Sequence, residues 1–221
     1  SNGQATTVAG GRAHTASGTY DTIGGGYNNI VCGYASTISA GYANRVTGTE
    51  NVVVGGRTNT NSGYRAFIGG GQNNNVSGAC ASIVGGYGSV ASASHTSIGG
   101  GQSNTASGVF SKAGGGYANT ASGCASVVSG GFGNTSTNCG TFVGGGYSNT
   151  ASNRYSAAHS GLNNLSQGIS SVIAGGQNNN VCNSTSGCLA YGAVVAGGVG
   201  NNTTGGTWTL ASCAFTVAPT I

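Results

Sequence analysis

The chain has 221 residues, among them 46 Gly and one Pro, with only six Lys or Arg and two Asp or Glu. A disordered chain of this length would be richer in charge and proline, and a collagen-like chain would need Gly at every third position, so both classes are excluded. The net charge of +4 comes from scattered cations and a shortage of acids, which argues against nucleic-acid binding. No apolar run approaches the roughly 20 residues of a membrane-spanning helix.

A 15-residue unit, seen in "TIGGGYNNIVCGYAS" at 22–36, is repeated along most of the chain. An apolar anchor residue recurs every 15 positions from Val8 to Ile173 without an insertion, giving twelve copies. Gly follows every anchor by three positions, and Asn follows by six in ten of the twelve copies, with His14 and Ser89 as the exceptions. A phosphate-binding glycine loop is needed once per site, so this regular recurrence predicts a structural role for the glycines.

Each unit is predicted to form one coil of a parallel β-solenoid, because 15 residues are too few for a helical-hairpin repeat. The anchor segment and the "T-A-S" segment read as strands, and "GGGYNN" and "G-x-x" read as turns. The anchor and the residue eight positions later should point inward and form a narrow core. The Gly column should mark positive φ or close chain approach, and the Asn column should bond its own turn and the adjacent coils. The fold class is therefore all-β, with about 13 coils.

The repeat changes after Ile173, where seven extra residues precede a thirteenth coil anchored at Val195, with Gly198 and Asn201 in place. We expect regular repeats over 1–187, an inserted loop and one further coil over 188–209, and a C-terminal cap or junction over 210–221. Caps shield the open end of a solenoid.

Seven cysteines suggest an oxidising, extracellular setting. Cys124 and Cys139 are one period apart, so their Cα atoms should lie about 4.8 Å apart, within reach of a disulfide. Cys182 and Cys188 flank the insertion and form a second candidate pair. The odd count leaves at least one thiol or an interchain bond. No close Cys pair accompanies a His, so no zinc site is expected.

Catalysis is not expected either. The only acids, Asp21 and Glu50, should lie about 10 Å apart on opposite faces, at or beyond the wide limit for an inverting pair. Recurrent Asp for calcium is absent. We therefore predict a non-enzymatic protein without cofactor or metal.

Two surface columns are candidate binding features. The fourth residue after the anchor gives a candidate ligand-facing strip, which either stacks over the turn or faces a carbohydrate: Tyr27, Tyr42, Gln72, Tyr87, Gln102, Tyr117, Phe132, Tyr147 and Gln177. The residue before the anchor gives a candidate interchain face: Val52, Phe67, Val127, Phe142 and Val172. Bulky apolar residues facing water are a liability, so this face predicts an oligomer.

The units "TIGGGYNNIVCGYAS", "SIGGGQSNTASGVFS" and "FVGGGYSNTASNRYS" resemble the head repeats of trimeric autotransporter adhesins and the GGGxxNTASG repeats of phage and virus tail-fibre-like proteins. The resemblance covers about residues 5–187 and again 195–209. It implies a left-handed β-roll, a homotrimer, and an extracellular fibre on a bacterial cell or virion that adheres to a glycan or protein receptor. Adhesin-head repeats are about one residue shorter, and no stalk, anchor or chaperone domain follows, so we expect a head or shaft.

The absence of Met and of a signal peptide predicts a processed or excised product. The expected function is a structural and adhesive fibre module that binds itself, without nucleic-acid or membrane partners. One alternative is a subunit of an end-to-end extracellular filament. Another is an ice-binding solenoid, which needs a flat face of regular Thr. The "T-A-S" columns supply such a face except where other residues interrupt it: Ile30, Arg45, Val90, Leu165 and Gln167.

Overall fold

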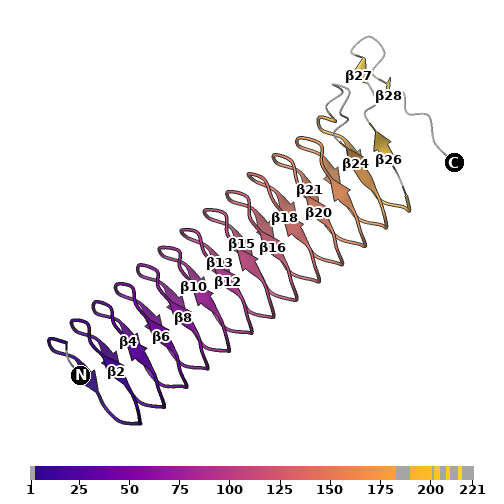
Figure 1. The fold of residues 1–221 in the computed structure, drawn as a ribbon. Coiled ribbons are helices and arrows are strands. Elements are labelled where there is room, and N and C mark those ends of the chain that lie inside the picture. The colour runs from indigo at the N-terminus through magenta and orange to yellow at the C-terminus, as the bar shows by residue number, and fades with distance from the viewer. Residues whose placement is uncertain (1–2, 183–189, 201, 205–207, 210–213, 216–221) are drawn as a thin grey trace.

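The structure is a straight rod of stacked coils with the N-terminal coil at one end (Figure 1). It is a computed structural model that describes residues 3–182, 190–200, 202–204, 208–209 and 214–215, with side chains for 3–181 and 190–200. Every element in these ranges is a strand. Within the same ranges, no helix has the length and hydropathy needed to cross a membrane.

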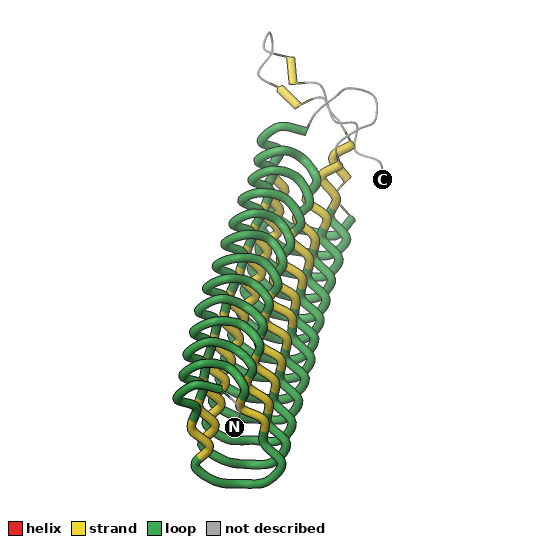
Figure 2. The backbone as a smooth tube through the Cα atoms, turned by 60° about the vertical axis from the view of Figure 1, so that its left-hand side comes forward, coloured by secondary structure: helices red, strands yellow, loops and turns green. Residues whose placement is uncertain are grey.

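Two parallel sheets run along the rod, and loops form its two edges (Figure 2). The first sheet contains the anchors in 13 strands: β1 (Thr7–Val8), β3 (Thr22–Ile23), β5 (Thr37–Ile38), β7 (Val52–Val53), β9 (Phe67–Ile68), β11 (Ser82–Ile83), β13 (Ser97–Ile98), β15 (Lys112–Ala113), β17 (Val127–Val128), β19 (Phe142–Val143), β21 (Ala157–Ala158), β23 (Val172–Ile173) and β25 (Val194–Val195).

The second sheet contains the "T-A-S" segments and also has 13 strands: β2 (Thr15–Ala16), β4 (Ile30–Val31), β6 (Arg45–Val46), β8 (Thr60–Asn61), β10 (Asn75–Val76), β12 (Val90–Ala91), β14 (Thr105–Ala106), β16 (Thr120–Ala121), β18 (Thr135–Ser136), β20 (Thr150–Ala151), β22 (Leu165–Ser166), β24 (Asn180–Cys182) and β26 (Asn202–Thr204). Most of these strands have only two residues because each 15-residue coil must also supply the two loops that connect the sheets.

The strand register confirms the predicted β-solenoid. Ile23 pairs with Ile38, and the offset stays at 15 residues up to Ile173. Ile173 then pairs with Val195, so the thirteenth coil joins the sheet across the seven extra residues, as predicted. Residues 183–189, Asn201 and most of the expected cap at 210–221 lie outside the described residues. Within the C-terminal part, β27 (Trp208–Thr209) and β28 (Ala214–Phe215) form a separate antiparallel pair.

The core is the predicted pair of inward columns between the two sheets. From Ile23 to Ile173 every anchor is at most 1% exposed, and Val31 and Val46 of the second column are fully buried. The second column also contains three buried polar residues, Asn61, Ser136 and Ser166. Each of them is hydrogen-bonded at the neighbouring corner of the coil, as in the 2.7 Å contact between the Ser136 and Thr141 hydroxyls. The apolar core is thin, so polar contacts carry much of the coil stacking.

The asparagine column (Asn at the sixth position after the anchor) joins successive coils, as predicted. Asn119 Nδ2 donates to the carbonyl of Gly115 in its own coil and to that of Gly131 in the next, each at 2.8 Å. Its Oδ1 accepts a 2.9 Å bond from the backbone N–H of Asn134. At the two exceptions, the Ser89 hydroxyl accepts from Asn104 N and the His14 Nδ1 accepts from Asn29 N. The side chain at this position is thus structural throughout the rod.

Three positions in every coil have left-handed backbone. The Gly column has φ of +80 to +112°, and a Cβ at Gly131 would lie 2.3 Å from the Gly146 carbonyl oxygen, which explains why only Gly occurs there. The fifth residue after the anchor and the third residue before it are also left-handed, with φ of +50 to +69°. The repeat pattern of the sequence does not predict these two columns.

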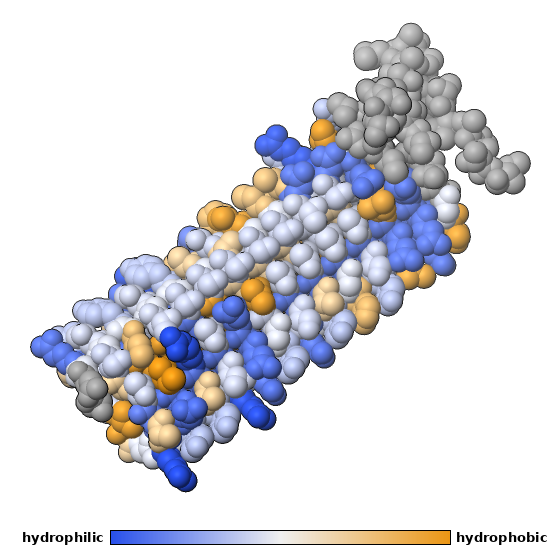
Figure 3. Space-filling view, viewed as in Figure 1, coloured by the Kyte–Doolittle hydropathy of each residue, from blue (hydrophilic) through white to orange (hydrophobic). Residues whose placement is uncertain are grey.

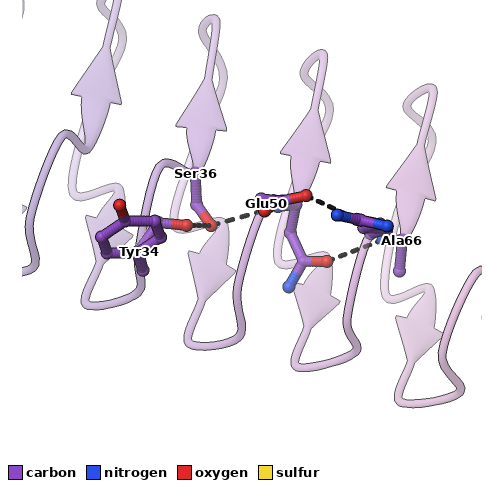
Figure 4. A network of polar contacts seen from close by, with 6 residues as sticks. Tyr34, Ser36, Glu50 and Ala66 are labelled. Carbon is purple, nitrogen blue, oxygen red and sulfur yellow. Dashed lines mark hydrogen bonds and ion pairs between the residues drawn. The ribbon is translucent and has the colours of Figure 1, made fainter.

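A second buried polar column lies two residues before the anchor. Asp21 accepts bonds from the backbone N–H groups of Gly33 and Ser36 in the next coil, at 3.0 and 3.1 Å. Ser36 donates to Gly48 O at 3.0 Å. Its hydroxyl also accepts from Asn51 N, and Asn51 Oδ1 accepts from Ala66 N at 2.8 Å (Figure 4). In these coils the column supports the corner opposite the asparagine column, whereas further along Ala66 and Ala81 occupy it and the Ser111 and Ser126 hydroxyls form no hydrogen bond.

Candidate binding surfaces

The predicted ligand-facing strip lies on the loop edge beside the Gly column, where its residues pair in register from coil to coil. Its aromatic rings are 41–49% exposed. Phe132 stacks between Tyr117 and Tyr147 with centroid distances of 4.8 Å on both sides and interplanar angles of 15° and 3°. Because this distance equals the coil spacing, the rings lie across the rod axis and cover one another's faces. The stack presents ring edges and hydroxyl groups to solvent.

The rest of this strip is interrupted. Tyr27 and Tyr42 stack at 5.4 Å, and the Arg57 guanidinium lies 5.3 Å from the Tyr42 centroid. Gln72 and Gln102 lie in register on either side of Tyr87. The geometry of the strip therefore agrees with side chains that stack over the turn. A sugar that binds on an aromatic face could not reach either face of Phe132, because the neighbouring rings cover both.

The predicted interchain face lies on the outer surface of the first sheet. Val52 and Phe67 are 36% and 39% exposed, whereas Val127, Phe142 and Val172 are half-buried. Strand pairing brings Val52 next to Phe67 and Val127 next to Phe142.

Between these two pairs the same column carries Ser82, Ser97 and Lys112, so the face is divided into patches. Figure 3 likewise shows apolar side chains in separate patches among hydrophilic ones on the face in view.

The cysteines of the described coils are free thiols. Cys124 and Cys139 occupy the same column, and Gly140 N donates to Cys124 O at 2.9 Å, but the disulfide expected between them is not formed in the structure. Cys32 and Cys80 are also free and exposed. The second candidate pair lies outside the described side chains, because neither Cys182 nor Cys188 has a described side chain.

The two acids have separate structural roles. Asp21 is fully buried and bonded to backbone N–H groups, while Glu50 lies on the surface and pairs with Arg65 Nε at 2.6 Å. This hydrogen bond raises the pKa of the Arg65 guanidinium. The described residues include no group of three or more His, Cys, Asp or Glu side chains that could hold a metal ion.

The structure presents one further surface that the sequence pattern does not predict. We call it the variable edge: the two residues that occupy the "x-x" of the G-x-x turn in each coil. Five of its aromatic residues are 43–59% exposed: Tyr20, Tyr34, Tyr64, Phe110 and Tyr155. Arg65 lies 4.8 Å from the Tyr64 centroid, and Arg154 lies 5.6 Å from that of Tyr155. The signal in the sequence was the lack of any consensus at these two positions.

Fold and surface define the chain as a parallel β-solenoid with a regular interior and chemically different edges. A scan against protein-family models finds no match, and a search of curated proteins finds no matching protein.

Proposed function

We propose that the chain is a non-enzymatic structural and adhesive fibre module, displayed outside the cell on a bacterial or virion surface. The observation that supports this most directly is the unbroken register of the coils, each tied to the next by backbone ladders and by buried side chains. Thirteen coils at the strand spacing make a rod about 58 Å long. Such a rod is suited to holding a binding surface at a fixed distance from its attachment point.

The predicted interchain face supports a homotrimer as the working assembly. The pairs Val52–Phe67 and Val127–Phe142 present two apolar patches on one line of the rod, separated by Ser82, Ser97 and Lys112. Three parallel copies around a common axis would bury this line from water, which is favourable in proportion to the apolar area removed. The fibre resemblance seen in the sequence agrees with this arrangement.

The test is the mass in solution by light scattering, together with electron microscopy of the purified chain. The proposal predicts a particle of three times the 21.1 kDa chain mass and short rods of uniform length. Phe142→Lys should dissociate the particle, whereas Tyr147→Lys, on the stacked strip, should not. A wild-type chain that stays monomeric at high concentration contradicts the trimer, and long end-to-end fibres would favour the filament alternative.

A second candidate, ice binding, is favoured by one observation on the second sheet. Four of the five residues that interrupt its Thr/Ser columns lie towards the two ends, Ile30 and Arg45 at one and Leu165 and Gln167 at the other, and only Val90 lies between them. Seven consecutive coils between them carry short, uncharged side chains in register: Thr60, Ser62, Asn75, Ser77, Val90, Ser92, Thr105, Ser107, Thr120, Ser122, Thr135, Thr137, Thr150 and Ser152. Thermal hysteresis that is abolished by Thr120→Lys would establish this function, and its absence in the wild type would exclude it.

A further inference from the structure

The variable edge carries side chains that the fold does not favour. Its second position is left-handed in every coil, with φ of +50 to +66°, yet bulky residues such as Tyr20, Phe110 and Tyr155 occupy it. L-residues other than Gly, Asn and Asp are disfavoured in this conformation. The fifth position after the anchor has the same backbone and carries only small or short side chains: Ala13, Asn28, Ala43, Thr58, Asn73, Gly88, Ser103, Ala118, Gly133, Ser148, Asn163, Asn178 and Gly200.

This contrast shows that backbone geometry alone does not determine which residues occupy the variable edge. If backbone geometry alone chose the residues, both left-handed columns would contain Asn, Gly and other small residues. Disfavoured conformations that persist are concentrated at functional sites. The bulky residues of the variable edge are therefore retained for what they present to solvent.

Two aromatic residues of the variable edge have small neighbours within their own column, although Tyr20 also meets the ring of Tyr34 edge-on at 5.8 Å. Tyr20 lies between Ala5 and Ala35 of its column, and Tyr155 lies between Gly140 and Ser170. A Cβ at Gly140 would lie 2.6 Å from Tyr155 Cδ1, so the ring is seated against the preceding coil. Tyr20 and Tyr155 are 53% and 58% exposed, and neither ring is stacked between two other aromatic rings as Phe132 is.

The charges on this edge favour an anion. Glu50 is its only acid and is already paired with Arg65, while Arg154 forms no ion pair among the described residues. A guanidinium beside an aromatic ring combines bidentate recognition of a carboxylate or sulfate with an apolar platform. Arg154 and Tyr155 form such a pair in one coil.

We propose that the variable edge binds an acidic glycan chain, with Arg154 and Tyr155 as its charged contact site and Tyr20, Tyr34 and Tyr64 as a second, aromatic contact site. The proposal rests on the proposed fibre function and names the ligand class of that fibre. The two sites are separated by six coils between Tyr64 and Tyr155, about 29 Å at the strand spacing. A polymer reaches both sites and a short oligosaccharide only one, so the affinity should increase with chain length.

The test measures binding of the full-length chain to hyaluronan, heparin and neutral dextran of matched length by biolayer interferometry. We expect hyaluronan, heparin or both to bind, with an affinity that falls at high salt, and dextran not to bind. The double variant Arg154→Gln/Tyr155→Asn keeps a residue suited to left-handed backbone and should lose at least about tenfold in affinity. The matched control Lys112→Gln/Tyr147→Asn removes the same residue classes from other surfaces and should change affinity by less than about twofold.

Three outcomes overturn the proposal: no binding to either acidic polymer, equal binding to dextran, or equal losses in the two double variants. The last would mean that binding follows net charge only. Light-scattering mass and circular dichroism on the same samples test the fibre separately. An assembled rod that binds no acidic glycan refutes this inference alone, whereas a chain that fails to assemble refutes the proposed function.

Discussion

The backbone N–H of Asn149 donates a 2.8 Å hydrogen bond to Oδ1 of Asn134, its counterpart one coil earlier. Nδ2 of Asn134 in turn donates to the carbonyls of Gly130 and Gly146, at 2.8 and 2.9 Å. One fully buried side chain therefore satisfies three backbone groups in two successive coils. Because the apolar core is thin, such contacts should contribute a large share of the stability of the stack.

Asn134→Ala should lower the free energy of unfolding by about 2–4 kcal/mol, because Gly130 O and Asn149 N lose their partners at a buried corner and Gly146 O keeps only its bond from Phe132 N. Denaturant titration followed by circular dichroism measures the change. The control is Asn75→Ala, whose side chain lies exposed on the second sheet, with an expected effect within about 0.5 kcal/mol. Similar losses for both variants would show that the column does not have this role.

Gly131→Ala should destabilise the rod strongly, by more than about 2 kcal/mol, because the residue has φ of +93° and the new Cβ would meet the Gly146 carbonyl. Its neighbour Gly130 is the matched control, since a Cβ there would come no closer than 3.9 Å to Gly115 O. Thermal melting compares the two. Equal melting temperatures would contradict the close approach of successive coils at this column.

The sequence predicts the coils, their register, the core and the roles of the Gly and Asn columns, since each depends on a pattern repeated many times. It predicts neither the left-handed columns that contain Asn28 and Tyr20 nor the second polar column at Asp21. Residue identity varies at those places, and only the backbone is constant. The surfaces are harder to predict from the sequence than the core. The stacking of Phe132 depends on the orientation of the rings, and the recurrence of aromatic residues in the sequence does not specify that orientation.

Cys80→Asn should stabilise the chain by about 0.5–1 kcal/mol, because Cys80 has φ of +55° and Asn tolerates that conformation better. The control is Cys124→Asn, the same substitution in the neighbouring column of the turn. Cys124 does not have positive φ, so this substitution should not increase the stability. Denaturation midpoints under reducing conditions report both. A gain from the second variant equal to that from the first would assign the effect to lost cysteine and not to backbone.

Mild oxidation should join Cys124 to Cys139, which are free thiols in adjacent coils. The closed loop of 15 residues should add about 3 kcal/mol by restricting the unfolded chain. Peptide mapping without reductant would find the linked pair, with Cys80 still reactive because neither Arg65 nor His95, its column neighbours, is a thiol. If both thiols of the pair still titrate after oxidation, they do not approach as the register requires.

The central claim is that each 15-residue unit is one coil, stacked directly on the last. Spin labels at Asn28→Cys and Asn163→Cys, in a chain with its native cysteines replaced by Ser, occupy one exposed column nine coils apart. Electron–electron distance measurement should give a narrow distribution near 43 Å, and moving the second label to Asn178→Cys should add about 4.8 Å. A broad distribution, or a distance that does not grow with the number of coils, would contradict the solenoid.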